Sequence, residues 1–279
     1  VYAPPRETAT LSFYGGLHGV GTFAAENREG FGASLMIAAA KTMEEAQGLL
    51  LARSVRYIVI PSWDPFFDEF AQRYLAKNFS NRTSLLAQEL RRWNLPPWLR
   101  PIPYQIPVSG GFEGQSVLVF EVVEEQSPAV AAGRLAEYLV ETGELDRAVA
   151  VAETLRRFPG DVGALVARAQ VQVAKEDGSG FAQTLAALQA RLANGADRFL
   201  PWDRRVSLAV VLARANQIDP AREQLKRCMA EADGKKLRSL TTGSLYGLEI
   251  LAKAFGLSMR DPALNELALS LLPRDWCER

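Results

Sequence analysis

Small residues recur at a fixed spacing in the second half of the chain. Each set has a small residue, a turn residue seven positions later and a small residue five positions after that: Ala136, Gly143 and Ala148, then Ala209, Asn216 and Ala221. Apolar residues follow a helical period on both sides of these turns. Two antiparallel helices joined by a short turn need small residues where their backbones approach closely. The spacing therefore predicts stacked helical hairpins over residues 127–279.

These positions match the small-residue positions of the tetratricopeptide repeat, which this half of the chain resembles. Residues 162–174 and 181–192 predict another helix pair, whose turn over 176–180 is longer than that repeat uses, and residues 240–255 and 262–271 predict a fourth pair. Helix-pair arrays present a concave surface that binds peptides or partner helices. We therefore expect a protein or peptide partner on the concave face. Four residues are expected at exposed positions: Arg134, Glu137, Arg168 and Arg205.

The first half predicts a small α/β domain over residues 1–126. Strands are expected over 8–14, 55–61 and 116–124, and helices over 27–40, 42–53, 66–77 and 84–93. Thr42 and Glu45 form a capping box, and the proline-rich stretch 96–107 predicts a loop or edge segment. Helical crossovers between the strands predict a mostly parallel sheet covered by helices. Ser127 and Pro128 suit the cap and first residue of a helix, so the all-α array begins there.

Charge and reactive side chains narrow the function. The 279 residues include 32 basic and 32 acidic side chains, and this zero net charge argues against a general nucleic-acid binder. His18 is the single histidine, and Cys228 and Cys277 are the two cysteines. These scattered residues build no zinc site, and a Ser-His-Asp or Cys-His site would need His18. We expect no metal, no other cofactor and no catalytic residue, while pairing of the cysteines stays open.

A second resemblance covers about residues 8–70. Its motifs are FYGG at 13–16, GVGT at 19–22, ENREG at 26–30 and a strand followed by SWD at 62–64. This stretch resembles the soluble extracytoplasmic region of bacterial multi-pass membrane proteins whose membrane-embedded part is similar to glycosyltransferases of the dolichyl-phosphate-sugar type. The resemblance implies a periplasmic location and membrane spans upstream. It also motivates the hypothesis that Glu26, Asn27 and Glu29 hydrogen-bond a sugar that stacks on Trp63.

Candidate ligand-binding residues gather after two predicted strands. The glycine-rich turn around His18 is either a cradle for an anionic oxygen, built from backbone N–H groups, or a tight hairpin. Asp64 follows the buried strand, where α/β sheets bind ligands, or it caps the helix that begins at Pro65. The candidate set is Gly16, His18, Gly19, Gly21, Glu26, Asn27, Trp63 and Asp64.

Three functions fit these observations. The first is a non-catalytic extracytoplasmic module of a membrane protein that binds other proteins or supports a membrane-embedded transferase. The second is an α/β enzyme or sugar-phosphate-binding domain with Asp64, Glu26 and His18 around a pocket. The third is a free-standing cytoplasmic scaffold of helical repeats.

Overall fold

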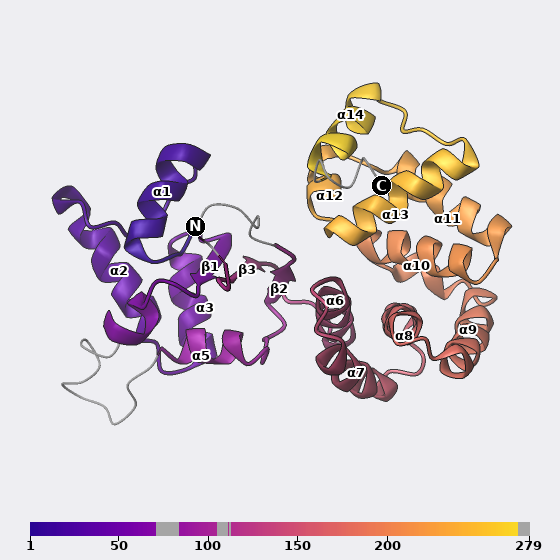
Figure 1. Ribbon diagram of the computed structural model, residues 1–279, viewed down its shortest axis with the longest axis horizontal. Helices are drawn as coiled ribbons and strands as arrows, with labels where there is room; N and C mark the ends of the chain where they lie inside the picture. The colour runs from indigo at the N-terminus through magenta and orange to yellow at the C-terminus, as the bar shows by residue number, and fades with distance from the viewer. Residues whose placement is uncertain (71–83, 105–110, 112, 273–279) are drawn as a thin grey trace. The chain divides into compact units, whose positions relative to one another are not determined.

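The computed structural model describes residues 1–70, 84–104, 111 and 113–272 (Figure 1). The chain divides into two compact units, Val1–Ser127 and Pro128–Arg279. The first unit combines helices with a small sheet, and the described part of the second unit is built from helices. Each unit has hydrophobic clusters of its own, so each is described by itself.

The first helix, α1 (Pro5–Gly15), occupies the segment for which we predicted a strand over 8–14. That prediction was wrong. Pro5 at the start of the helix and Glu7 in its first turn favour helix initiation. Gly16 then ends the helix in the left-handed conformation, with φ 63°. These boundary signals outweigh the weak strand preference of the threonine and aromatic residues between them.

The next helices confirm several local predictions. A short 3-10 turn, η1 (Ala25–Asn27), leads into α2 (Arg28–Ala38), and α3 (Met43–Ala52) follows. The Thr42 hydroxyl accepts a hydrogen bond from the Glu45 N–H at 3.1 Å, while the Glu45 carboxylate reaches the Lys41 N–H at 2.7 Å. A π-helix, η2 (Phe66–Phe70), stands where a helix was expected over 66–77, of which 71–77 lie outside the described residues. The next described helix of this unit is α5 (Leu85–Arg91).

The sheet is antiparallel, so the prediction of a mostly parallel sheet was wrong. Its order is β1–β3–β2, with β1 (Tyr57–Pro61), β2 (Leu99–Ile102) and β3 (Val117–Val122). The prediction depended on a strand over 8–14, which is the helix α1. The third strand instead comes from the proline-rich stretch, of which 105–107 lie outside the described residues. Pro101 is tolerated because β2 is an edge strand.

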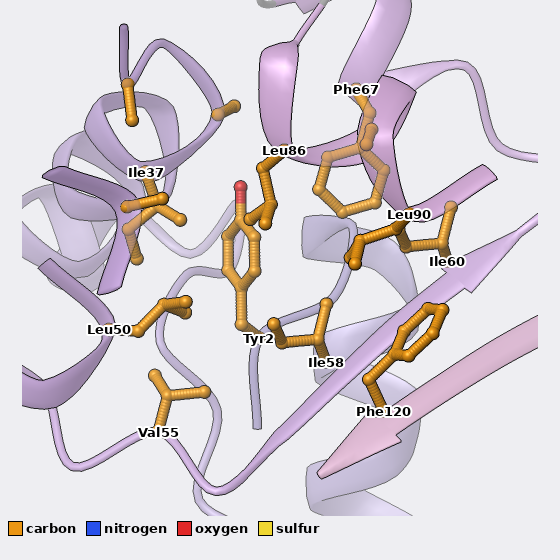
Figure 2. Packing of buried hydrophobic residues seen from close by; sticks show 14 of the residues in the cluster. Tyr2, Ile37, Leu50, Val55, Ile58, Ile60, Phe67, Leu86, Leu90 and Phe120 are labelled. Carbon is orange, nitrogen blue, oxygen red and sulfur yellow. The ribbon is translucent and has the colours of Figure 1, made fainter. Parts of the chain in front are cut away.

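Tyr2 lies at the centre of the core of the first unit (Figure 2). Its N–H donates to the Tyr57 carbonyl at 2.8 Å, and its carbonyl accepts from the Val59 N–H at 2.9 Å, which joins the N-terminal segment to β1. The phenol donates to the Ser34 carbonyl at 3.1 Å, and burial raises the pKa of Tyr2 well above its ordinary value. Buried side chains of α2, α3, α5 and the sheet lie around the ring: Ile37, Leu50, Leu86 and Ile58.

Four helical hairpins build residues 128–272, the part of the second unit that the structure describes. They are α6 (Pro128–Glu141) with α7 (Leu145–Thr154), α8 (Val162–Ala174) with α9 (Gly178–Leu192), α10 (Trp202–Arg214) with α11 (Ile218–Ala230), and α13 (Thr242–Phe255) with α14 (Pro262–Leu271). The connections contain η3 (Leu155–Arg157), η4 (Ala196–Phe199) and α12 (Gly234–Arg238). The first helix of each hairpin packs on the first helix of the next: α6 on α8, α8 on α10 and α10 on α13. Helix α12 was not predicted.

The first three hairpins share one turn geometry. Their turns are 142–144, 175–177 and 215–217, and the middle residue of each is left-handed: Gly143 (φ 78°), Glu176 (φ 60°) and Asn216 (φ 57°). Seven positions earlier each hairpin has a fully buried alanine: Ala136, Ala169 and Ala209. The longer turn predicted over 176–180 was therefore wrong. Helix α9 begins at Gly178 because the Asp177 carboxylate accepts from the Gly180 N–H at 2.9 Å and caps the helix.

Candidate functional site

The glycine-rich stretch after α1 is a loop packed against two helices, and the expected tight hairpin is not present because helices, not strands, flank it. A Cβ at Gly19 would lie 2.0 Å from the Cγ2 of Thr8 on α1. A Cβ at Gly21 would lie 2.6 Å from the Oγ of Ser34 on α2. Close packing therefore accounts for these two glycines, as helix termination accounts for Gly16. The exposed His18 contributes its backbone carbonyl, which accepts a hydrogen bond from the Val1 amino group.

The polar residues near η1 make local contacts. The Asn27 side-chain amide donates to the Thr22 hydroxyl at 3.1 Å, which ties the glycine loop to the start of α2. Glu29 pairs with Arg53 at 2.9 Å, and the Glu26 side chain is exposed. Asn27 is thus engaged in shaping the loop.

Trp63 and Asp64 follow β1 and also contact neighbouring backbone and side chains. The Trp63 indole donates to the Glu7 carboxylate at 3.0 Å. The Asp64 carboxylate accepts from the Phe66 N–H at 2.8 Å, so the capping role that we considered for it is present. Within the described residues, no hydrogen bond or ion pair joins His18, Glu26 and Asp64 to one another.

Charged side chains in the second unit connect hairpins that are not adjacent in sequence. Arg134 on α6 pairs with Asp203 on α10 through two hydrogen bonds of 2.9 Å. One turn further along α6, Glu137 pairs with Arg204, and both side chains are at least 96% buried. These contacts pass over the second hairpin. Two ion pairs therefore join the first and third hairpins directly.

Burial and ion pairs correct our expectation for the exposed set. Glu137 is only 4% exposed, and Arg134 is mostly covered by its partner. Arg205 pairs with Glu231 at 2.9 Å, and Arg168 lies half-buried between α7 and α8. The prediction failed because repeat position assigns a face to a residue but does not say whether another helix covers that face.

A cleft of about 530 Å³ lies between the second and third hairpins. This volume is typical of sites that bind small molecules or peptide side chains. One wall is the end of α9 with η4, and the other is α11 with Leu212 of α10. The apolar lining residues are Leu192, Ala193, Leu212 and Pro220. The polar lining residues are Asn194, Asp197, Arg198, Glu223, Gln224 and Arg227.

Two polar side chains form the floor of this cleft. Asp197 on η4 is 7% exposed, and Gln224 on α11 is 8% exposed. The Gln224 amide donates to Asp197 Oδ2 at 2.7 Å, and Arg227 Nη1 donates to the same oxygen at 3.3 Å. The cleft thus has more polar than apolar lining residues, and hydrogen bonds hold three of the polar side chains, Asp197, Gln224 and Arg227, in place.

Comparison of the chain with protein-family models, curated proteins and solved structures finds no match. No helix in the described part of the chain is long and apolar enough to cross a bilayer. Across the described ranges, no three His, Cys, Asp or Glu side chains are grouped as a metal ion would require. The candidate site therefore rests on the geometry of the cleft.

The cleft residues were missed by sequence analysis. Asp197 and Gln224 are 27 residues apart and belong to different hairpins, so no motif connects them. The local signal is limited to one acidic residue, Asp197, in the connection between α9 and α10.

Proposed function

We propose that this protein is a non-catalytic scaffold whose helical unit binds a segment of a partner protein in the cleft between the second and third hairpins. The cleft itself is the observation that carries the proposal. Ion pairs between α6 and α10 engage charged side chains of these first helices, whereas the cleft is open between α9 and α11. Helical-hairpin arrays commonly serve as binding surfaces of this kind.

The rival function, an α/β enzyme or sugar-phosphate-binding domain, draws little support from the candidate residues. Asp64 caps its own turn, and Asn27 and Trp63 are held by neighbouring side chains. Gly19 and Gly21 are in close contact with Thr8 and Ser34, which leaves no room for a phosphate on that side of the loop. We therefore favour a binding role for the cleft of the helical unit over a ligand site at these residues of the first unit.

The proposal is tested by selecting a phage-displayed random-peptide library on the whole chain. We expect enriched peptides whose binding is lost in Ala193→Trp, because the new indole fills the cleft from an exposed position. The matched control is Ala186→Trp, which adds the same side chain to an exposed position of α9 that does not line the cleft. Equal binding of every selected peptide to Ala193→Trp would contradict the proposal.

We further propose, from the sequence resemblance, that this chain is the extracytoplasmic part of a membrane protein. An exposed apolar tip on α1 supports attachment to another surface: Phe13 is 81% and Tyr14 83% exposed, and Leu17 follows at 40%. Translation of the complete gene tests this proposal. Membrane-spanning segments encoded upstream of Val1 are expected, and a gene that encodes none contradicts it.

A further inference from the structure

The floor of the cleft has unused hydrogen-bond acceptors. Both hydrogen bonds that the described residues donate to the Asp197 carboxylate go to Oδ2, from Gln224 and Arg227. Oδ1 receives none from them. The Oε1 of Gln224 is buried and also has no hydrogen-bond partner among the described residues. Buried acceptors without a donor are rare in folded proteins because their desolvation is not compensated.

The charged side chains that line the cleft are two acidic and two basic. Arg227 donates to Glu223 Oε1 at 3.3 Å as well as to Asp197, so one guanidinium is shared between two carboxylates. Asp197, Glu223 and Arg227 together carry one net negative charge, and the exposed Arg198 brings the sum for the cleft to zero. Asp197 is the member of this group that is most withdrawn from water, and its attraction for a cation is least weakened by solvent.

We propose that the cleft binds an arginine side chain of the partner segment, an inference that rests on the function proposed above. A guanidinium presents several N–H donors in a planar fork, which suits the free Asp197 oxygen and the neighbouring Gln224 oxygen. Its aliphatic stem would lie against the apolar wall of Leu192, Leu212 and Pro220. An ammonium group supplies the charge without the fork, so arginine is preferred over lysine.

Arg198 also lines the cleft, and its charge is opposite to that of Asp197. Its side chain is exposed at the cleft and forms no ion pair with the described carboxylates, so it would favour an anionic ligand and oppose a cationic one. Arginine binding at the floor thus predicts that Arg198→Ala strengthens binding. Binding of an acidic segment would predict the opposite result.

The experiment uses peptides that the phage selection enriches, made synthetically and titrated against the whole chain by calorimetry. Replacement of the peptide arginine by citrulline, which keeps the shape and removes the charge, should weaken binding about tenfold or more. Replacement by lysine should weaken it less. The variants Asp197→Asn and Gln224→Met should lose affinity for the arginine peptide, whereas Arg198→Ala should gain it.

The outcomes separate this inference from the proposed function. Peptides that need the open cleft but tolerate citrulline, or that lose binding in Arg198→Ala, overturn the arginine inference and leave the scaffold function standing. Peptides that bind Ala193→Trp normally overturn both. The citrulline comparison uses the wild-type chain, so it decides the question even where Asp197→Asn fails to fold.

Discussion

Arg134 and Asp203 form a forked ion pair between α6 and α10, in which Nε and Nη2 each donate to a different carboxylate oxygen at 2.9 Å. The two residues are 69 positions apart and belong to the first and third hairpins. Beside them lies the buried pair Glu137–Arg204, and the Thr241 hydroxyl, at the start of α13, contacts the Glu141 carboxylate. One side of α6 is thereby fastened to two later hairpins. These contacts join the first hairpin to the third and the fourth.

Replacing Arg134 by Met should lower the free energy of unfolding by about 2–3 kcal/mol, because Asp203 loses two charge-assisted hydrogen bonds while remaining mostly buried. Arg134→Lys should lose less, since it keeps the charge and loses the fork. Urea unfolding followed by circular dichroism measures both. In a double-mutant cycle, Asp203→Asn should reduce the effect of Arg134→Met. Additive effects would show that the pair contributes nothing to stability.

Two glycines on the same helix should respond in opposite ways to alanine. At Gly30 a Cβ would lie 2.1 Å from the Val20 carbonyl oxygen, so Gly30→Ala forces the glycine loop away from α2. We expect a loss of more than about 3 kcal/mol in stability, in the range of severe overpacking. Gly32 has no atom within 4 Å of the same position, and Gly32→Ala should stabilise by about 0.5–1 kcal/mol. Thermal denaturation of the pair checks the close approach, and equal effects would contradict it.

The turn of the second hairpin should be improved by glycine. Glu176 has φ 60°, a conformation that costs a residue with a Cβ about 1–2 kcal/mol. Glu176→Gly should therefore stabilise the helical unit by about 0.5–1 kcal/mol after the added freedom of the unfolded chain is subtracted. Gly143→Ala in the first turn should destabilise it by a similar amount. Chemical denaturation compares the two, and a destabilising Glu176→Gly would disprove the shared turn geometry.

Glu141 should make stability depend on pH. Removal from water raises the pKa of this carboxyl, and the hydrogen bonds from Thr241 and Gly243 offset the effect only in part. Because the folded protein then binds the proton more tightly than the unfolded chain, this group favours folding most below its unfolded pKa of 4.5. Its contribution decreases as pH rises through the folded pKa.

Glu141→Gln should remove this dependence. Unfolding measured from about pH 4 to about pH 7 should show a smaller decrease in stability with rising pH for the variant than for the wild type. Identical pH profiles would mean that the carboxyl is ionised equally well in both states. Glu144→Gln, at an exposed position in the following turn, is the control for removing one negative charge.

Cys228 should be unreactive in the folded protein. Its side chain is fully buried on α11, and burial raises its pKa to about 12, so almost no thiolate exists at neutral pH. The measurement is labelling with an aromatic disulfide reagent in a Cys277→Ser background, since Cys277 lies outside the described residues. Labelling should occur only at the rate of unfolding. Immediate labelling without denaturant would contradict the burial of this thiol.

In the first unit, local signals predicted some elements and missed others. The strand at β1, the strand at β3 and the capped helix α3 were recognisable because an apolar β-branched run and a capping box act within a few residues. The helix α1 was missed because its start and stop signals competed with residues that favour strands. The sheet direction followed from that error, since antiparallel pairing depends on which segments become strands.

The candidate ligand residues show a related limit. Gly19 and Gly21 looked like a phosphate-binding turn, but their small size is needed because α1 and α2 approach the loop closely. Asp64 looked available for chemistry, and its carboxylate caps the backbone two residues later. A glycine can be required for close packing or for phosphate binding, and an aspartate for capping or for chemistry. The sequence alone does not distinguish these causes.

The sequence by itself determined the helical hairpins of the second half, because helix periodicity, caps and small-residue spacing are interactions within one hairpin. The turn at Glu176 follows the same spacing once Ala169 is aligned with Ala136. Only the tertiary structure decided which side chains meet between hairpins, as Arg134 meets Asp203 and Asp197 meets Gln224. Those contacts depend on the curvature of the stack, which is the sum of small rotations at every interface between hairpins. No local pattern of residues records this sum.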